Sequence, residues 1–371
     1  MKILILTPSL AIGGAERAAC NIADALARTS LRPSVSILAV TSPASGSSTI
    51  APPAEIPTEI QEHRRMVQGV FPALRVIHRD KPDVVISHQR PLNLLLAAFL
   101  PIMKLLLGYR PKLIAVEHAV PLFIYRWTSS RKDGLLEHFV PLFYRAADAV
   151  VCPSTTCAEA IRKKWPQLSK KTFAIPNPVP PPSTRSQLIQ DDKKKPSVLL
   201  VGRLDDVKDF SLAIRAFEIA ARHNDIELII IGDGPERNHL AELVAKLGIS
   251  SRVTFTGFVN DPNRFFSKRN LVLMTSRAEH LPMVLIEALR GGCNIVSVDC
   301  PVGPREILEN GSLGTLVLTR NPNDIARAIE ARLQNPIDPE RLRAAAARYA
   351  PEKIGQEYGN LASSLAQGPH H

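Results

Sequence analysis

The chain has 371 residues, which is long for one hydrophobic core and favours two domains. With 45% hydrophobic and 22% charged residues, it has the composition of an ordinary globular protein. The five cysteines are scattered and form no C-x-x-C pair or Cys/His cluster, which argues against a disulfide framework and a structural zinc site and indicates a reducing compartment. Met1 leads directly into the strand-like run KILILT, so we expect no signal peptide.

The positive charge lies almost entirely in the first half of the chain. Residues 1–175 contain 22 Lys+Arg against 12 Asp+Glu, a balance of +10, whereas the rest contains 24 against 23, a balance of +1. An anionic membrane surface or an acidic acceptor explains this charge, and so does plain solubility. Nucleic acid is a weaker explanation, because aromatic residues make up only 5% of the chain and stacking platforms are scarce.

The first predicted element is a buried strand from Lys2 to Thr7, followed by an amphipathic helix from Ala15 to about Arg28. Gly13 and Gly14 lie between them, where backbone N–H groups can approach a phosphate or a sugar because no side chain stands in the way. An ordinary tight turn is the alternative. Residues 41–57 follow as a predicted low-complexity loop.

A short strand from Val84 to Ser87 precedes the most apolar segment, Pro91 to Gly108. Pro101 and Lys104 interrupt this segment, and its unbroken apolar part is too short for a membrane span of roughly 20 residues. It is therefore predicted as a buried helix covering the sheet. A helix lying on a membrane surface is the alternative, which the basic residues that follow it up to Lys132 keep open.

The next strand runs from Lys112 to Val116 and ends at Glu117 and His118. A single histidine is more often structural than catalytic, but this one lies at a strand end, on the edge expected to carry the Gly13 loop. A further strand is predicted from Asp148 to Cys152.

The segment Ile175 to Pro182 is the clearest boundary, because its five prolines can neither pair in a central strand nor continue a helix. We therefore predict a first domain over residues 1–175, a linker over 176–196 and a second domain over 197–340. Helices over 341–367 are expected to pack back toward the first domain.

The second domain begins with a strand at Ser197, followed by a loop and helix with Arg203 and Lys208 at the helix entrance. Two cations at a helix N-terminus oppose the helix dipole unless an anion joins them, which favours phosphate binding over a merely solvated loop. The strand Glu227 to Ile231 ends in the turn GDGP, and Val253 to Phe255 leads into TGFV, a turn able to hold a nucleobase by backbone contacts.

The central stretch follows the strand Leu271 to Met274. It places Glu279 in a polar loop and Glu287 inside a helix that begins near Pro282, before the next strand, Asn294 to Val298. This order suits a site at the carboxyl edge of a parallel sheet, and the helix start suits a diphosphate. A carboxylate among apolar residues, as at Glu287, needs a polar partner.

The alternation of strands and helices on both sides of the proline-rich segment predicts an α/β fold of two doubly wound domains that face each other across a ligand cleft.

Six short motifs occur together and in order along nearly the whole chain. They are GGAER at residues 13–17, EH at 117–118, VGRLDDVKD at 201–209, GDGP at 232–235, TGFV at 256–259 and the stretch from Glu279 to Glu287. Each is weak alone, but the set resembles glycosyltransferase family 4, the retaining GT-B enzymes. Within that family it is similar to bacterial enzymes that extend lipid-linked oligosaccharides or surface polysaccharides, since GGAER, LPMVLIEAL and CPVGPREIL are present.

The resemblance implies a role for each matching residue. His118 and Glu279 would be catalytic, and Glu287 would bind the ribose. The donor diphosphate would contact Arg203, Lys208, Gly14 and Leu281, the donor sugar Gly13, His280 and Pro282, and the base Phe258 and Val259. The family often has glycine after the first glutamate, and His280 stands there instead, which puts the backbone geometry of the sugar pocket in doubt.

The implied reaction is retaining transfer of a hexose or N-acetylhexosamine without metal or cofactor. UDP is the favoured nucleotide, GDP is the alternative, and the acceptor would be a glycan or lipid-linked glycan. No nucleophile is evident, so attack on the face of departure is favoured. The implied location is the cytoplasm, with peripheral attachment to the inner face of the inner membrane left open.

Three other enzymes fit the architecture less well. An epimerase would need no acceptor, a phosphorylase would need a lysine for pyridoxal phosphate that we cannot place, and an NAD oxidoreductase would need the full glycine fingerprint. A non-catalytic protein that binds polyanions through its basic half also remains open. It would bind sugar nucleotides without releasing the nucleotide.

Overall fold

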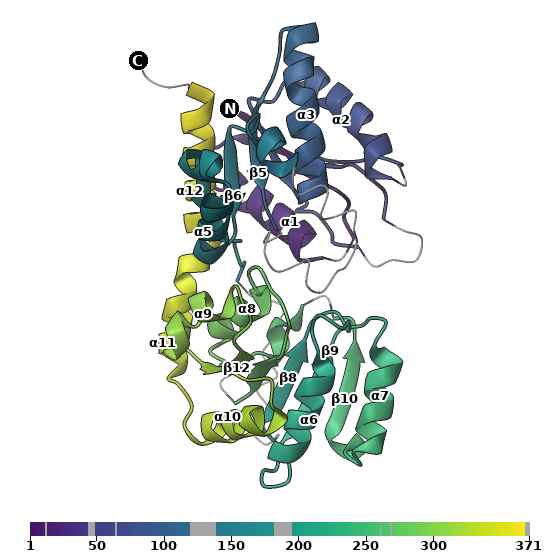
Figure 1. Ribbon diagram of the computed structural model, residues 1–371, viewed down its shortest axis with the longest axis vertical. Coiled ribbons are helices and arrows are strands. Elements are labelled where there is room, and N and C mark those ends of the chain that lie inside the picture. The colour runs from purple at the N-terminus through teal and green to yellow at the C-terminus, as the bar shows by residue number, and fades with distance from the viewer. Residues whose placement is uncertain are drawn as a thin grey trace. The chain divides into compact units, whose positions relative to one another are not determined.

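The computed structural model describes residues 1–11, 13–43, 49–63, 65–118, 139–181, 195–259, 261–267 and 269–367 (Figure 1). The chain divides into two compact units. Unit 1 consists of Met1–Pro180 and Tyr349–His371, and unit 2 of Pro181–Arg348. Residues 182–194 of the predicted linker lie outside the described residues. Its first part packs within unit 1, where the Val179 N–H donates to the Tyr349 carbonyl and the Asn21 amide donates to the Pro178 carbonyl.

Unit 1 contains a seven-stranded sheet in the order β3-β2-β1-β4-β5-β6-β7, and every pairing is parallel. The strands are β1 (Lys2–Thr7), β2 (Ser34–Ala39), β3 (Thr58–Ile60), β4 (Val84–His88), β5 (Lys112–Val116), β6 (Ala149–Cys152) and β7 (Thr172–Ala174). Its helices are α1 (Gly14–Ala27), α2 (Met66–Asp80), α3 (Arg90–Leu107), α5 (Thr155–Lys164) and α12 (Pro351–Gln367), with the 3-10 turn η2 (Pro166–Lys171). The strands β4 and β6 are buried along their whole length, because helices cover both faces of such a sheet.

Unit 2 contains a six-stranded parallel sheet in the order β10-β9-β8-β11-β12-β13. The strands are β8 (Ser197–Val201), β9 (Glu227–Ile231), β10 (Val253–Gly257), β11 (Leu271–Met274), β12 (Asn294–Val298) and β13 (Thr315–Val317). Its helices are α6 (Phe210–Ala220), α7 (Arg237–Lys246), α8 (Met283–Gly291), α9 (Pro304–Ile307), α10 (Pro322–Gln334) and α11 (Pro339–Ala346). Short 3-10 turns are η3 (Ser250–Arg252), η4 (Pro262–Phe265) and η5 (Glu309–Gly311), and η6 (Ala347–Tyr349) spans the boundary between the units.

The predicted fold class of two doubly wound parallel α/β domains is confirmed. In each sheet the strand order reverses once, between β1 and β4 in unit 1 and between β8 and β11 in unit 2. Ligands of open α/β sheets bind outside the carboxyl ends of the strands at this reversal. We therefore expect ligand-binding residues in the loops that follow β1, β4, β8 and β11.

The predicted C-terminal helices divide between the two units. Helix α11 packs on α8 in unit 2, whereas α12, yellow in Figure 1, packs on α1 in unit 1. The contact between α12 and α1 is close, because a methyl group on Gly355 would lie 2.4 Å from the carbonyl oxygen of Ala25. The chain thus returns to unit 1 through a helix whose glycine fits against α1.

Helix α3 matches the predicted apolar segment and divides into two parts. Its first two-thirds has one buried face, formed by residues such as Leu92, Leu96 and Leu100, as expected for a helix that packs on the sheet. Its last turn instead exposes Leu105 and Leu106, at 84% and 74%. Among the described helices, α3 is the one with the length and mean hydropathy, 1.6, of a membrane span, and these two criteria alone are weak evidence for one.

We expect Gly355→Ala to destabilise the protein even though alanine favours a helix by about 0.5–1 kcal/mol over glycine. The added methyl group meets the α1 backbone, and overpacking of this kind costs about 1–3 kcal/mol. The matched control is Gly14→Ala, whose methyl group has nothing within 4 Å and should cause no loss. Urea denaturation followed by circular dichroism measures both. A Gly355→Ala variant as stable as the control would contradict the close packing.

Candidate functional site

A partly buried ion pair joins the two loops at the strand reversal of unit 2. The Lys208 Nζ, after β8, lies 2.5 Å from Oε1 of Glu279, after β11, and the two side chains are only 24% and 12% exposed. The Ser276 hydroxyl donates to the same carboxylate oxygen at 2.7 Å. Burial works to lower the pKa of Lys208, but the Glu279 carboxylate outweighs it, so the pKa is raised and the side chain stays charged.

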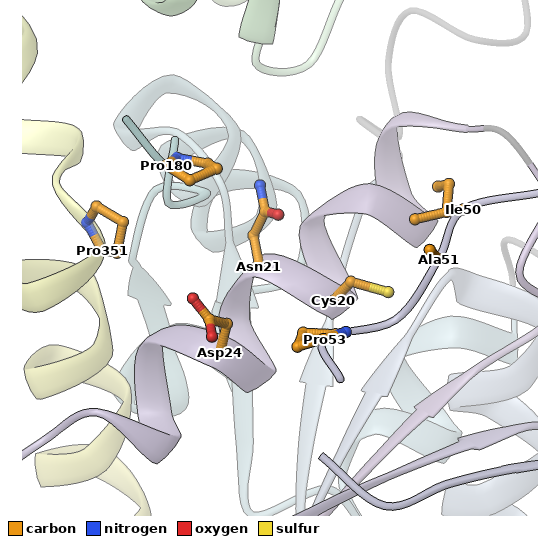
Figure 2. Close-up of a pocket in the computed structure, with 8 residues that line it drawn as sticks. All are labelled: Cys20, Asn21, Asp24, Ile50, Ala51, Pro53, Pro180 and Pro351. Carbon is orange, nitrogen blue, oxygen red and sulfur yellow. The ribbon is translucent and has the colours of Figure 1, made fainter. Parts of the chain in front are cut away.

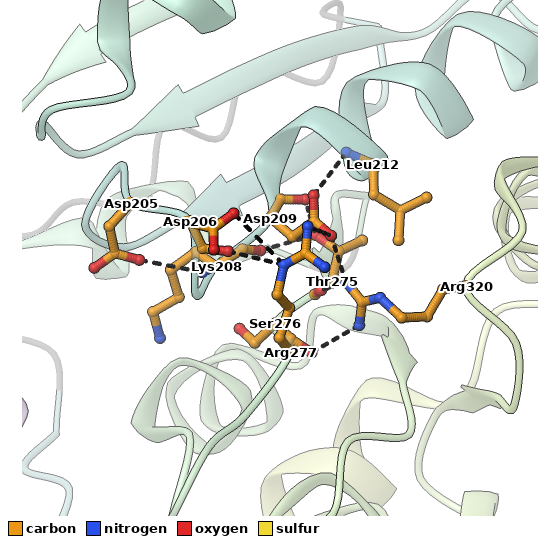
Figure 3. A network of polar contacts seen from close by, with 9 residues as sticks. All are labelled: Asp205, Asp206, Lys208, Asp209, Leu212, Thr275, Ser276, Arg277 and Arg320. Atoms are coloured by element: carbon orange, nitrogen blue, oxygen red, sulfur yellow. Dashed lines mark hydrogen bonds and ion pairs between the residues drawn. The ribbon is translucent and has the colours of Figure 1, made fainter. Parts of the chain in front are cut away.

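Asp209, the residue after Lys208, anchors this arrangement. Its Oδ2 accepts from Nη2 of Arg320 at 2.6 Å and from Nη2 of Arg277 at 2.9 Å, and Figure 3 shows both guanidinium groups turned toward it. Its other oxygen accepts from the Leu212 N–H at the start of α6. Asp209 itself has φ +47°, a left-handed conformation uncommon for a residue other than glycine. Its contacts therefore hold a strained backbone beside Lys208.

Backbone contacts fasten the same two loops to each other. The buried Thr275 hydroxyl donates to the carbonyl oxygens of Lys208 and Asp209, at 3.1 and 2.9 Å. The Arg277 N–H donates to the Val207 carbonyl at 2.8 Å. The residues on either side of Lys208, Val207 and Asp209, are both fixed by these hydrogen bonds. The Lys208 side chain therefore starts from a fixed backbone position that directs its ammonium group toward Glu279.

The predicted cations at the entrance of α6 differ in their surroundings. The sequence analysis reasoned that these two cations need an anion to offset the helix dipole, and for Lys208 the Glu279 carboxylate supplies a negative charge within the protein. Phosphate binding by Lys208 and Arg203 stays a prediction. Glu279 is too far along the chain for sequence reasoning to have paired it with Lys208. Arg203 has an exposed side chain, 71%, and its nearest recorded acidic partner is Asp205 at 3.9 Å.

Three glycine turns lie side by side at this edge. A methyl group on Gly232 would lie 1.8 Å from the Gly202 carbonyl oxygen, and the Gly232 N–H donates to the Gly257 carbonyl. Only glycine at position 232 allows the turn after β9 to approach the turn after β8 this closely. Beyond the last turn, Phe258 is exposed and Val259 is half-buried, so both predicted base-binding residues lie on the edge that carries Lys208.

The start of α8 completes the unit 2 edge. Leu281 and Pro282 are buried, His280 is half-buried, and Gly303 abuts Pro282, where a methyl group would lie 2.3 Å from the proline Cδ. Glu287 lies within α8 and is 8% exposed. All the predicted unit 2 residues therefore follow strand ends on one sheet edge or belong to the helix that begins there.

In unit 1 the glycine loop after β1 carries a carboxylate. The Glu16 side chain folds over Gly13 so closely that a methyl group there would lie 2.1 Å from its Oε2. Gln89, after β4, donates to Glu16 Oε1 at 2.5 Å and has the unusual φ of +72°. Burial raises the pKa of Glu16, while its own backbone N–H and Gln89 oppose the rise. A carboxylate at this helix start favours hydroxyl groups over a phosphate, which weighs against the role predicted for Gly14.

Two histidines meet at the ends of β4 and β5. The Nδ1 of His88 lies 2.9 Å from the Nε2 of His118, and their rings are nearly parallel. His88 is completely buried, and burial, together with His118, lowers the pKa of His88 well below its usual value. Beside them the buried Glu117 accepts from Arg90 and from the Tyr144 hydroxyl, both at 2.9 Å. His118 thus belongs to a polar cluster at the unit 1 strand reversal.

Figure 2 shows a cavity of about 240 Å³ in unit 1 that contains none of the predicted site residues. Helix α1 supplies Cys20, Asn21 and Asp24 to the wall of this cavity. The polar groups of Asn21 and Asp24 already have partners in the protein, and the Cys20 thiol stays protonated. Asn21 bonds the Pro178 carbonyl, Asp24 pairs with Arg28, and burial raises the pKa of the Cys20 thiol to about 11. Within the residues that the structure describes, no group of three or more His, Cys, Asp or Glu side chains is placed to hold a metal ion.

Two family models match the chain in succession. The model described as Glycosyltransferase Family 4 matches residues 12–181, and the model described as Glycosyl transferases group 1 matches residues 185–349. The chain belongs to the GT-B glycosyltransferases of family 4. The resemblance inferred from the sequence motifs is therefore confirmed.

Several relatives carry names from this class. The chain is 27% identical over 239 residues to a 4-alpha-N-acetylgalactosaminyltransferase of Campylobacter jejuni named for a diphospho-undecaprenol substrate, covering 64% of each chain. It is 28% identical over 259 residues to an uncharacterized glycosyltransferase of Methanocaldococcus jannaschii, covering 66% of this chain and 62% of the relative. These matches span less than two-thirds of each relative's length.

Several solved structures share the fold of this chain. HepE of Anabaena in complex with UDP superposes with a TM-score of 0.77 at 21% identity, covering 98% of this chain and all of the other. Sucrose-phosphate synthase of Thermosynechococcus elongatus gives 0.75 at 19% identity, covering 98% of each chain. At these identities the likeness establishes the GT-B fold.

Sequence reasoning missed the residues that hold the site together. Asp209 and Arg320 are 111 positions apart, and Glu16 and Gln89 are 73 apart, so no local pattern pairs them. His88 carried a usable signal, because it ends β4, the neighbour of the strand that ends at His118. Adjacent parallel strands bring such residues to one edge.

We expect Asp209→Asn to lower the free energy of unfolding by about 1–3 kcal/mol, because asparagine keeps the helix cap but leaves Arg277 and Arg320 without their shared carboxylate. Asp206→Asn removes the same charge from the same loop and is the control. Its side chain is 78% exposed and 3.7 Å from Arg277, so little change is expected. Thermal unfolding of both variants measures the difference, and equal midpoints would show that Asp209 is not an anchor.

Proposed function

We propose that the protein transfers a sugar from a nucleotide diphosphate donor, with UDP favoured, to a glycan or lipid-linked acceptor. The observation that carries the proposal is the partly buried Lys208–Glu279 pair at the strand reversal of unit 2, where an open α/β sheet binds its ligand. HepE, which shares the fold, has been solved with UDP and with UDP-glucose, and the Campylobacter jejuni relative is named for a diphospho-undecaprenol acceptor. Both names support a UDP-sugar donor and a lipid-linked acceptor.

The donor diphosphate is proposed to bind Lys208 and Arg203. Lys208 is charged, and its contacts hold its ammonium group in one position. The Arg203 side chain is exposed, and its planar guanidinium group can donate two parallel hydrogen bonds to phosphate oxygens. Two cations neutralise a leaving diphosphate, so no metal is needed in this proposal. The open backbone N–H groups at the start of α8, next to Leu281, add a partial positive charge.

Other unit 2 residues are assigned by their position along the same edge. Glu287 in α8 is proposed to bind the ribose hydroxyls, and Phe258 and Val259 to contact the base. His280 and Pro282 are proposed to lie against the donor sugar, with Glu279 at its reacting centre. When the diphosphate shares Lys208, the Glu279 carboxylate gains capacity to accept a hydrogen bond from the sugar.

The proposed mechanism is retaining, with attack on the face from which the phosphate leaves. The bond between the anomeric carbon and the phosphate oxygen breaks, the acceptor oxygen bonds to that carbon, and the acceptor proton passes to the departing phosphate. The transition state resembles an oxocarbenium ion, so stabilising the leaving group matters more than a strong base. In unit 1, Gly13 and His118 are proposed to contact sugar hydroxyls, because the Glu16 carboxylate beside Gly13 and the neutral His88 behind His118 suit uncharged groups.

The acceptor side is proposed to rest on an anionic membrane surface on the cytoplasmic face. Unit 1 exposes a set of apolar side chains, here called the α2/α3 patch, consisting of Val67, Phe71, Ile102, Leu105, Leu106 and Leu107. The two helices pack together, with the rings of Phe71 and Phe99 5.2 Å apart. The balance of +10 over residues 1–175 complements anionic lipid, which favours this occupant of the patch.

We expect Lys208→Met to weaken UDP binding by about tenfold or more, since a charge-assisted hydrogen bond contributes about 1.5–3 kcal/mol. Lys195→Met is the control, because Lys195 pairs with Asp225 before β8 begins and so lies at the opposite edge of the sheet. Isothermal titration with UDP measures both, and a UDP-sugar turnover screen follows. Unchanged UDP affinity in Lys208→Met would remove the diphosphate assignment, and sugar conversion without an acceptor would indicate an epimerase.

We expect wild-type protein to float with anionic vesicles and a double variant, Leu105→Asp with Leu106→Asp, to lose most of this binding, because it places two negative charges on the α2/α3 patch. Leu318→Asp is the control, since Leu318 is similarly exposed, at 75%, but lies in unit 2. Binding should fall at high salt. Wild-type protein that stays unbound at low salt would count against the membrane assignment.

A further inference from the structure

The contact between His88 and His118 restricts where their protons lie. Nδ1 of His88 and Nε2 of His118 are 2.9 Å apart, so one of these nitrogens donates a hydrogen bond and the other accepts it. His88 is fully buried at the end of β4, whereas His118 is half-buried at the end of β5. Two positions of the proton are compatible with this contact. They differ in whether His88 Nε2 carries a proton.

The far nitrogen of His88 distinguishes the two arrangements. His88 Nε2 is buried and has no hydrogen-bond partner among the residues that the structure describes. If His118 donated, His88 would carry its proton on this Nε2, as a buried N–H without an acceptor. If His88 donates from Nδ1, Nε2 is left only as an unfilled acceptor. Buried donors without a partner are the rarer case in proteins, which favours donation by His88.

A charged pair is also disfavoured. Burial, together with the neighbouring His118, lowers the pKa of His88 well below its usual value, so His88 is neutral near neutral pH. A neutral His88 with its proton on Nδ1 has no lone pair directed at His118. It therefore cannot accept a hydrogen bond from a protonated His118 Nε2.

We propose that His88 is a positioning residue that donates from Nδ1 to Nε2 of His118 and so fixes His118 as the neutral tautomer with its proton on Nδ1. The Nε2 lone pair of His118 is then occupied by the His88 N–H. His118 cannot take up a proton at Nε2 unless the His88 proton leaves Nδ1. His118 Nε2 therefore does not act as a general base.

The role of this tautomer in catalysis rests on the proposed function, and the assignment makes the proposed part of His118 more specific. A neutral imidazole suits an uncharged carbohydrate in unit 1 better than an imidazolium would. The assignment also agrees with a mechanism in which the leaving phosphate, and no histidine, receives the acceptor proton.

The tautomer is measured directly by long-range ¹H–¹⁵N correlation spectra of the ligand-free, ¹⁵N-labelled full-length protein near neutral pH. The chain contains ten histidines, and the signals of His118 are those that disappear in His118→Gln. We expect a protonated Nδ1 and an unprotonated Nε2 at His118, the reverse of the tautomer that predominates in a free histidine side chain. A proton on His118 Nε2, or on both of its nitrogens, would overturn the proposal.

Two variants of His88 separate positioning from general support of the fold. His88→Gln retains an N–H donor and should keep the Nδ1–H tautomer of His118, whereas His88→Phe removes the donor and should return His118 to Nε2–H. If His88→Phe does not fold, the spectra of the wild type and of His88→Gln still show which nitrogen of His118 carries the proton. No nucleotide is present in this experiment, so loss of the UDP assignment and loss of the tautomer assignment are distinguishable results.

Discussion

The ion pair between Lys208 and Glu279 is the constraint around which unit 2 is arranged. Removing two charges from water costs several kcal/mol per ion, and the attraction between them offsets this only when the geometry is good. The protein maintains that geometry through Asp209, Thr275 and Ser276, which fix the loops on either side. A charge held in place before a ligand arrives needs little rearrangement when an anion binds, which is the basis of electrostatic preorganisation.

The two units use one topology for different chemistry. Both sheets reverse their strand order once and collect polar loops at that point. Unit 2 places cations there, with Arg203 exposed and Lys208 fixed, as a phosphate requires. Unit 1 places Glu16 over its glycine loop and a neutral His88 behind His118, which suits hydroxyl groups. Under the proposed function, the fold sets where ligands bind, and the loop residues set which ligand each unit accepts.

Much of the fold could be predicted because its strands are short apolar runs with sharp ends. The predicted bounds of β1, β5, β9, β11 and β12 agree with the structure, and α8 begins at Met283, directly after the proline at which its start was predicted. The site was predictable only as separate motifs. The partner of Lys208, the anchoring of Asp209 by Arg320 and the carboxylate over Gly13 depend on residues far apart in the chain. Such contacts follow from strand order, which no single segment encodes.

A crystal structure of the protein with UDP tests the central claim most directly, because it locates the diphosphate relative to Lys208. The account predicts phosphate oxygens within hydrogen-bond distance of Lys208 Nζ and the Arg203 guanidinium, with the ribose hydroxyls at Glu287. It also predicts that Asp209 keeps its contacts with Arg277 and Arg320 when UDP binds, because these contacts hold the loop in place. UDP bound elsewhere, with Lys208 still paired only with Glu279, would contradict it.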